Sequence, residues 1–234
     1  MSPVPPNNIP TSFGPEEAAT YDERFSKLSA VNSLLHLVVQ SQFASLPDTA
    51  HILIAGAGTG AEVRYLAPLF PSWRFTLADP SDAMLEIARR HAVEEGFADR
   101  CTFHAGYVSS LPEAEFDAAT SLLVSHFLNE EEDRTAYYSS IAERLRPGAP
   151  LFEAALCGNR SDPIFEMEMD VWLGLLTLAG MAAEGRENYR KSFGTLFAAH
   201  DPSEVEKMIG AAKFDRPVQC FQAGLIRGWI TQRL

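Results

Sequence analysis

The chain has 234 residues, of which 46% are hydrophobic and 21% charged, and 19 lysines and arginines against 31 aspartates and glutamates give a formal charge of −12. This apolar content excludes a disordered chain, and the length fits one large domain or two small ones rather than a disulfide-stapled miniprotein. The negative charge argues against a nucleic-acid or anionic-membrane partner, because phosphates would be repelled.

The cysteine pattern and the apolar runs predict a cytoplasmic protein with no membrane partner. Cys101, Cys157 and Cys220 lie far apart and form no CxxC pair, which is typical of reduced thiols. The N-terminus lacks the basic and apolar regions of a secretory signal, and the apolar stretch 171–183 is shorter than the ~20 residues of a membrane span. The six histidines show no metal-like spacing, so no metal site is expected.

The first two thirds of the chain change from helices to alternating strands and helices. Residues 1–15 are expected to form a flexible arm, followed by helices at 16–30 and 31–46 that Pro47 terminates. Strands are then predicted at 52–55, 74–78, 102–104, 116–123 and 150–155. Helices are predicted between them at 62–70, 82–95 and 130–145. This alternation indicates parallel βαβ units with helices on both faces of a sheet.

After residue 160 the pattern becomes helical and then ends in two extended runs. Helical segments are predicted at 163–183 and from there to about 199, and Asp201-Pro202-Ser203-Glu204 is a helix start with a capping residue. The runs 218–222 and 225–232 flank Ala223-Gly224, which predicts an antiparallel hairpin at the end of the sheet.

The strongest motif is the run from Ile52 to Gly60, in which an apolar strand enters a glycine turn before a helix. Glycines let the backbone approach a ligand without an intervening Cβ, and the helix adds unpaired N–H groups. Such a turn suits a nucleotide-like ligand at the carboxyl edge of a parallel sheet. Gly56-x-Gly58-x-x-Ala61 also satisfies the dinucleotide fingerprint, so an NAD(P)-dependent oxidoreductase stays open as an alternative.

Asp79 is the second candidate, at the end of the second predicted strand. A carboxylate at this place can accept hydrogen bonds from both hydroxyls of a ribose, in NAD enzymes as well. A helix cap or a turn residue is the structural alternative for a lone aspartate after a strand.

Four segments in order resemble the class I S-adenosylmethionine-dependent methyltransferases over about residues 48–157. They are 56–60, 77–85, 116–128 and 145–148. The resemblance implies an α/β fold with a Rossmann-like, doubly wound, seven-stranded sheet, mostly parallel, whose C-terminal hairpin supplies an antiparallel strand. It also implies S-adenosyl-L-methionine as the cofactor and S-adenosyl-L-homocysteine as the product. N-terminal helices and a helical insertion before the last two strands would complete the fold.

By the same resemblance, residues of several loops would bind the cofactor: Tyr21, Gly56, Ala57, Gly58, Gly60, Asp79, Pro80, Met84, Tyr107, Val108, Ser121 and Leu122. The three glycines would flank the methionine part and the ribose. Asp79 would hold the ribose hydroxyls, and Met84 would pack near the adenine. Ile54 and Tyr107 stand where the family usually has acids, which leaves open a non-catalytic relative.

The methyl acceptor would be bound outside the sheet. A sulfonium methyl is already activated, so a base is needed only for an acceptor that must lose a proton. His126 is the candidate base, with a structural histidine as the alternative. Phe165, Met169 and Trp172 are candidate acceptor contacts on a helix apolar on more than one face, which could also be extra core or a homodimer interface. Lys191 joins them through a faint resemblance to carboxy-S-adenosylmethionine synthases, in which a basic residue holds a carboxylate.

These observations predict one methyltransferase-like domain acting on a small, partly apolar metabolite. Its expected parts are a helical lid at 16–47, a cofactor-binding core at 48–157, a helical cap at 158–200, and a closing helix with a hairpin at 201–234. The alternatives are an NAD(P)-dependent oxidoreductase, a carboxy-S-adenosylmethionine synthase-like enzyme and a non-catalytic protein of the same fold.

Overall fold

A computed structural model describes residue 14, residues 26–112 and residues 114–234. The predicted arm, most of the predicted helix at 16–30, and Tyr21 lie outside the described residues. A 3₁₀ turn, η1 (Ser26–Leu28), leads into helix α2 (Ser29–Phe43). α2 corresponds to the helix predicted at about 31–46 and begins two residues earlier than expected.

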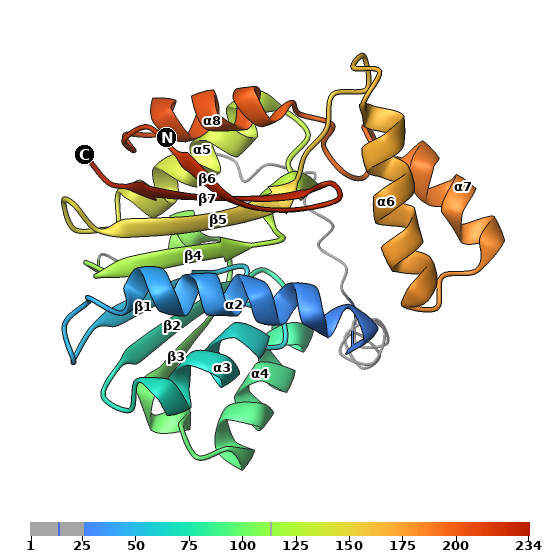
Figure 1. The fold of residues 1–234 in the computed structure, drawn as a ribbon. Helices are drawn as coiled ribbons and strands as arrows, with labels where there is room; N and C mark the ends of the chain where they lie inside the picture. Colours follow the sequence, from blue (N-terminus) through green and yellow to red (C-terminus); the bar gives the residue numbers. More distant parts are fainter. Residues whose placement is uncertain (1–13, 15–25, 113) are drawn as a thin grey trace.

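One seven-stranded sheet runs through the molecule in the order β3-β2-β1-β4-β5-β7-β6 (Figure 1). Its strands are β1 (His51–Ala55), β2 (Arg74–Asp79), β3 (Cys101–Ala105), β4 (Ala118–Leu122), β5 (Pro150–Leu156), β6 (Val218–Ala223) and β7 (Ile226–Gln232). β1 pairs in parallel with β2 and β4, whereas β7 is antiparallel to both β5 and β6. The predicted doubly wound sheet with a final antiparallel hairpin is confirmed.

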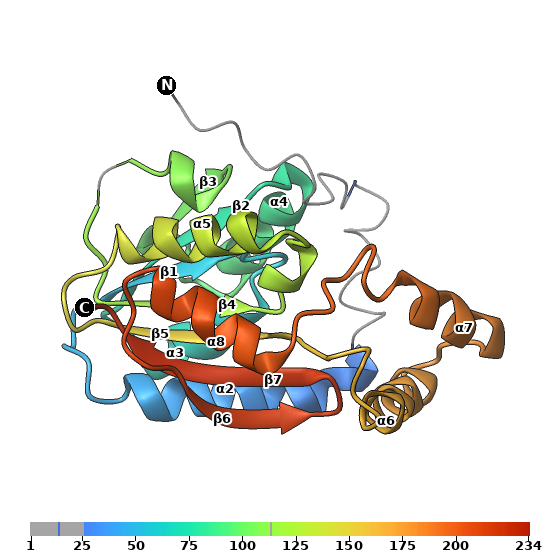
Figure 2. The ribbon, with the colours of Figure 1, turned by 90° about the horizontal axis from the view of Figure 1, so that it is seen from above.

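Helices cover both faces of the sheet (Figures 1 and 2). On one face lie α2, α3 (Ala61–Leu69) and α4 (Asp82–Glu94), and on the other lie α5 (Glu131–Ala142) and α8 (Pro202–Ala211). Short 3₁₀ turns complete the connections: η2 (Ala98–Arg100), η3 (Val108–Ser110) and η4 (Ser125–Phe127). The predicted start of α8 is confirmed, since Asp201 caps it and forms a capping box with Glu204.

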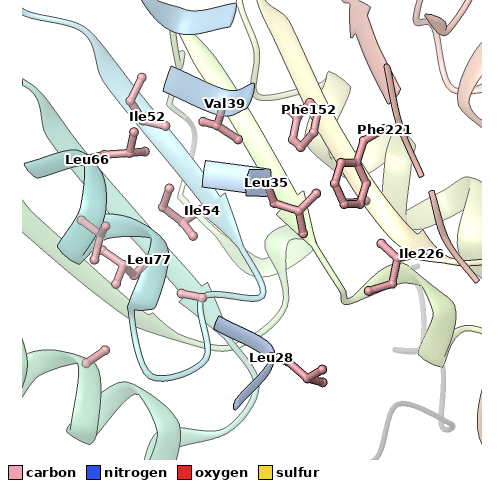
Figure 3. Packing of buried hydrophobic residues seen from close by; sticks show 14 of the residues in the cluster. Leu28, Leu35, Val39, Ile52, Ile54, Leu66, Leu77, Phe152, Phe221 and Ile226 are labelled. Atoms are coloured by element: carbon pink, nitrogen blue, oxygen red, sulfur yellow. The ribbon is translucent and has the colours of Figure 1, made fainter. Parts of the chain in front are cut away.

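Strand periodicity explains how the core is divided. Side chains alternate along a strand, so Ile52 and Ile54 of β1 belong to the core on the α2 and α3 side, while Leu53 belongs to the core on the other. Figure 3 shows Ile52 and Ile54 among the buried side chains that include Val39 of α2 and Leu66 of α3. The central strand β1 is thus buried on both faces, as is typical of the parallel part of such a sheet.

Two helices, α6 (Phe165–Leu178) and α7 (Ala183–Ser192), lie beyond one end of the sheet and apart from both helical layers (Figures 1 and 2). Helical segments were predicted at about 163–183 and from there to about 199, and α6 and α7 lie in these two segments. α6 ends earlier than expected, because the chain turns at Gly180 with φ +104°, a conformation that favours glycine. α6 is only partly buried, since Met167, Val171 and Leu178 are exposed.

Within the described ranges, no helix has the length and the apolar character that crossing a membrane would require.

Candidate functional site

A cavity of about 610 Å³ lies where the parallel strands end. The residues that line one side belong to the carboxyl ends of β1, β2, β4 and β5 or follow them directly: Gly56, Asp79, Leu122 and Leu156 among others. The opposite side comes from the start of α2, from α6 and α7, and from the segment before α8. Open α/β sheets bind their ligands at this edge.

The glycine turn after β1 forms one wall of the cavity. The Gly56 and Ala57 N–H groups both donate to the Ala78 carbonyl, at 2.8 and 3.1 Å, which fixes the turn to β2. Gly56 has φ +77°, and a Cβ on it would lie 2.3 Å from Val124 Cγ2. Gly58 has φ +52°, but a Cβ there would meet no atom within 4 Å. Packing therefore demands glycine at position 56, whereas Gly58 leaves open space beside the cavity that it lines.

Asp79 connects this turn to the end of β2. Its Oδ2 accepts the Gly58 N–H at 2.9 Å, and its Oδ1 accepts the Ser81 N–H at 2.8 Å. Burial raises the pKa of this carboxyl, and the two backbone donors act in the opposite direction. Each carboxylate oxygen has a second lone pair, so Asp79 can still accept hydrogen bonds from a ligand in the cavity that it lines.

The structure brings most of the predicted cofactor residues to this cavity. The lining residues among them are Gly56, Gly58, Asp79, Pro80, Met84, Tyr107, Val108 and Leu122. Ala57 and Gly60 are not among the lining residues, and Gly60 instead forms the N-cap of α3. Ser121 is fully buried behind the wall, where its Oγ accepts the Tyr137 hydroxyl at 2.8 Å.

A buried acid lies next to the glycine turn. Glu62, in the first turn of α3, is only 6% exposed, and its Oε1 accepts no hydrogen bond from any described residue. Burial raises the pKa of this carboxyl to about 7, with the Thr120 hydroxyl acting in the opposite direction. Thr120 of β4 pairs with Ile54 of β1, the strand position at which the family resemblance leads one to expect an acid. Glu62 of α3, whose carboxyl interacts with the Thr120 hydroxyl, therefore places an acid near that position.

A buried polar group lies next to the cavity and joins β5, α5 and η4. We call Ser125, Arg134, Tyr138, Glu153 and His200 the Arg134 cluster. The Arg134 guanidinium donates to Ser125 Oγ at 2.8 Å and to the Tyr138 hydroxyl at 3.0 Å. Ser125 donates in turn to Glu153 Oε1, which lies 3.9 Å from Arg134 Nη2. His200 Nδ1 lies 3.2 Å from Arg134 Nη1. The cluster fixes η4, which carries His126.

His126 lines the cavity, but its surroundings disfavour the predicted role as a base. Its Nδ1 accepts the Leu156 N–H at 3.4 Å, so in the neutral ring the proton resides on Nε2. Burial and the positive charge of Arg134 lower the pKa of His126 to about 3. The ring is therefore neutral near pH 7, and Nε2 is a hydrogen-bond donor.

The predicted acceptor residues divide into one that lines the cavity and three that do not. Trp172 is a lining residue, whereas Phe165 and Met169 are buried in the core without reaching the cavity. Lys191 is exposed on α7, where its Nζ lies 3.5 Å from Glu187 Oε1. Leu176, from the same apolar stretch, also lines the cavity, and five further lining residues had no predicted site role: Asn32, Phe127, Tyr137, Tyr189 and Phe197. In the part of the chain that the structure describes, no group of three His, Cys, Asp or Glu residues could hold a metal ion.

The family described as "Methyltransferase domain" matches residues 52–148. An uncharacterized protein of Synechococcus sp. is 40% identical over 103 residues, which cover 43% of this chain and 24% of that protein. This chain therefore spans about a quarter of that relative. The ubiquinone/menaquinone biosynthesis C-methyltransferase UbiE of Hahella chejuensis is 24% identical over 207 residues, or 83% of this chain and 82% of UbiE.

The same fold occurs in the crystal structure of magnesium protoporphyrin IX methyltransferase from Synechocystis PCC 6803, which contains bound SAH. The TM-score is 0.58 at 18% identity, and the match covers 88% of this chain and 82% of that one.

The two glycines of the turn should respond differently to alanine. Gly58→Ala carries only the strain of a left-handed residue, about 1–2 kcal/mol. Gly56→Ala carries the same strain and an overlap with Val124, worth about 1–3 kcal/mol more. Urea unfolding should therefore rank Gly56→Ala as the less stable variant. Gly148→Ala, at φ +78° with open space around it, is the matched control and should resemble Gly58→Ala. Equal losses at positions 56 and 58 would contradict this account.

Glu62 should make stability depend on pH. Its pKa is about 7 in the folded chain and near the usual 4.5 when unfolded. Between these values the folded state binds the extra proton, so the free energy of unfolding falls as the pH rises, by on the order of 3 kcal/mol. Glu62→Gln removes this loss, so its stability relative to the wild type should increase from about pH 4 to about pH 8. Urea unfolding at both pH values measures this, with exposed Glu94→Gln as a control that shows no such trend.

Proposed function

Because the chain belongs to the class I S-adenosylmethionine-dependent methyltransferases, we propose that it transfers a methyl group from S-adenosyl-L-methionine to a small, partly apolar metabolite. The observation that carries the proposal is a single cavity with two unlike halves. One half contains the glycine turn and Asp79, and the other is formed mainly by apolar and aromatic side chains of the insertion and of α2, with Asn32 among them.

The residues present fit this cofactor. Gly58 leaves the space of a missing Cβ open, and Asp79 has lone pairs available for two ribose hydroxyls. Pro80, Met84 and Tyr107 supply apolar and aromatic contacts suited to the adenine. When bound, S-adenosylmethionine supplies an electrophilic methyl group on a sulfonium. Among the described lining residues, Asp79 is the one aspartate or glutamate, and there is no lysine or arginine. A cationic ligand therefore meets no positively charged side chain that would repel it.

The same charges argue against the NAD(P) alternative. A dinucleotide would place its pyrophosphate at the start of α3. There the Gly58 N–H already donates to Asp79 Oδ2, so it is not available to a phosphate oxygen. The Asp79 carboxylate would also repel the phosphates. The carboxy-S-adenosylmethionine synthase alternative depended on Lys191, which lies outside the cavity, so it gains no support.

The proposed role of the protein residues is to hold the acceptor in line with the methyl group. Alignment of two bound reactants can contribute roughly 7–11 kcal/mol to lowering a barrier. His126 contributes a donor rather than a base, so the reaction suits acceptors that are nucleophilic without losing a proton to the protein. Apolar walls limit the water around the acceptor.

Two further expectations remain proposals. Cys101, Cys157 and Cys220 are all free, which supports a reducing compartment such as the cytoplasm. The exposed apolar side chains of α6, Met167, Val171 and Leu178, offer a surface for a homodimer.

Asp79 provides the test of the proposed function. Each charge-assisted hydrogen bond is worth about 1.5–3 kcal/mol, so Asp79→Ala should weaken binding of S-adenosylhomocysteine by at least about tenfold. Isothermal titration calorimetry measures this loss. Asp82→Ala, which removes a neighbouring exposed acid, is the matched control and should bind like the wild type.

The same titration distinguishes the rivals. Wild-type binding of NADH without binding of S-adenosylhomocysteine would overturn the proposal. Binding of neither compound would support the non-catalytic alternative. Unchanged affinity in Asp79→Ala would show that Asp79 does not hold the ribose.

A further inference from the structure

Tyr189 of α7 places a hydroxyl in the half of the cavity formed by α2, α6 and α7, where Asn32 and His126 are the other polar lining residues beside mainly apolar and aromatic ones. The Trp172 Nε1–H donates to the Tyr189 hydroxyl oxygen at 2.8 Å, and both residues line the cavity. No described residue accepts the hydroxyl proton of Tyr189 in return. Burial raises the pKa of Tyr189, so the hydroxyl keeps its proton at any physiological pH. Tyr189 is therefore a hydrogen-bond donor whose oxygen is held in place by Trp172.

Aromatic rings surround this donor. Tyr189 stacks on Phe197 with ring centroids 5.2 Å apart and an interplanar angle of 28°. Phe197 lies in turn 5.7 Å from Phe127 and 5.8 Å from His126, measured between ring centroids. All four rings line the cavity. Such a wall binds a flat aromatic molecule better than a flexible chain, because rings stack at these separations.

A second donor belongs to the same wall. The Nε2–H of His126 is left over once Nδ1 accepts the Leu156 N–H. The wall thus offers two donors, on the two rings that lie 5.8 and 5.2 Å from Phe197. Two donors need lone pairs on the ligand, which a protonated amine lacks and a phenolic, enolic or carbonyl oxygen has. An anionic oxygen would form the stronger, charge-assisted bonds.

From this arrangement, which rests on the proposed function, we infer that Tyr189 recognises the acceptor. Its hydroxyl donates to an oxygen atom carried on an aromatic ring, and Trp172 positions that hydroxyl. The acceptor class is therefore an oxygenated aromatic molecule rather than a fatty chain. The Phe197 wall stacks the ring while Tyr189 fixes its orientation toward the cofactor half.

The test removes the Tyr189 hydroxyl and asks whether a ligand with a hydroxyl loses more affinity than a ligand of similar shape without one. The probes are 2-naphthol and 2-methylnaphthalene, which differ by a hydroxyl in place of a methyl group. Their binding to the full chain saturated with S-adenosylhomocysteine is measured by equilibrium dialysis for the wild type and Tyr189→Phe. A hydrogen bond of ordinary strength predicts that Tyr189→Phe weakens 2-naphthol relative to 2-methylnaphthalene by about two- to tenfold.

Tyr65→Phe is the matched control, because the Tyr65 hydroxyl donates to Gln40 at 2.6 Å and does not line the cavity. It should leave both affinities at wild-type values. The inference is overturned if Tyr189→Phe binds S-adenosylhomocysteine normally yet keeps the wild-type ratio of the two probes, or if 2-naphthol does not bind at all. Loss of S-adenosylhomocysteine binding in the wild type would instead overturn the proposed function on which the inference rests.

Discussion

The wall of the cavity depends on a pair of opposite charges that water does not reach. Arg134 of α5 and Glu153 of β5 are both fully buried, and burying such charges is costly unless hydrogen bonds replace those to water. Ser125 and Tyr138 supply these bonds, and one carboxylate oxygen of Glu153 still has no partner among the residues described. The pair links a helix, a strand and η4, so the backbone that carries His126 has little freedom to move.

The positive charge of Arg134 also determines the protonation state of His126. A histidine in water would share its proton with solvent near neutral pH. Here the nearby guanidinium of Arg134 and the surrounding core favour the neutral ring, and the Leu156 N–H selects which nitrogen keeps the proton. A structural ion pair and a cavity donor are thus parts of one arrangement. The acidity of the chain has a different location, since Glu130, Glu131 and Glu132 lie exposed at the start of α5.

The sequence predicts the sheet and the cofactor half well because local rules act there. The apolar run of β1, the glycine turn at 56–60 and the acid at the end of β2 need no knowledge of distant residues. The acceptor half is different. Tyr189 lies in a helix of otherwise mostly polar residues, and Phe197 lies in an irregular segment. No periodic pattern marks them, and only the packing of α6 and α7 over the end of the sheet brings them together. His126 was found as a candidate, but its buried neighbour Arg134 occupies a helix that resembles a solvent-exposed one in sequence.

The tip of the terminal hairpin is in direct contact with the acceptor half. Gly224 has φ +57°, and a Cβ on it would lie 3.2 Å from Trp172 Cβ and 3.3 Å from the Trp172 backbone. Substitutions at the tip of the hairpin and in α6 are therefore not independent of one another. A side chain gained at position 224 would push α6 away and displace Trp172 from Tyr189. A lineage that adopted a different acceptor by altering α6 would meet the same constraint from the other direction. Epistasis between two sites some fifty residues apart is thus built into the closure of this sheet.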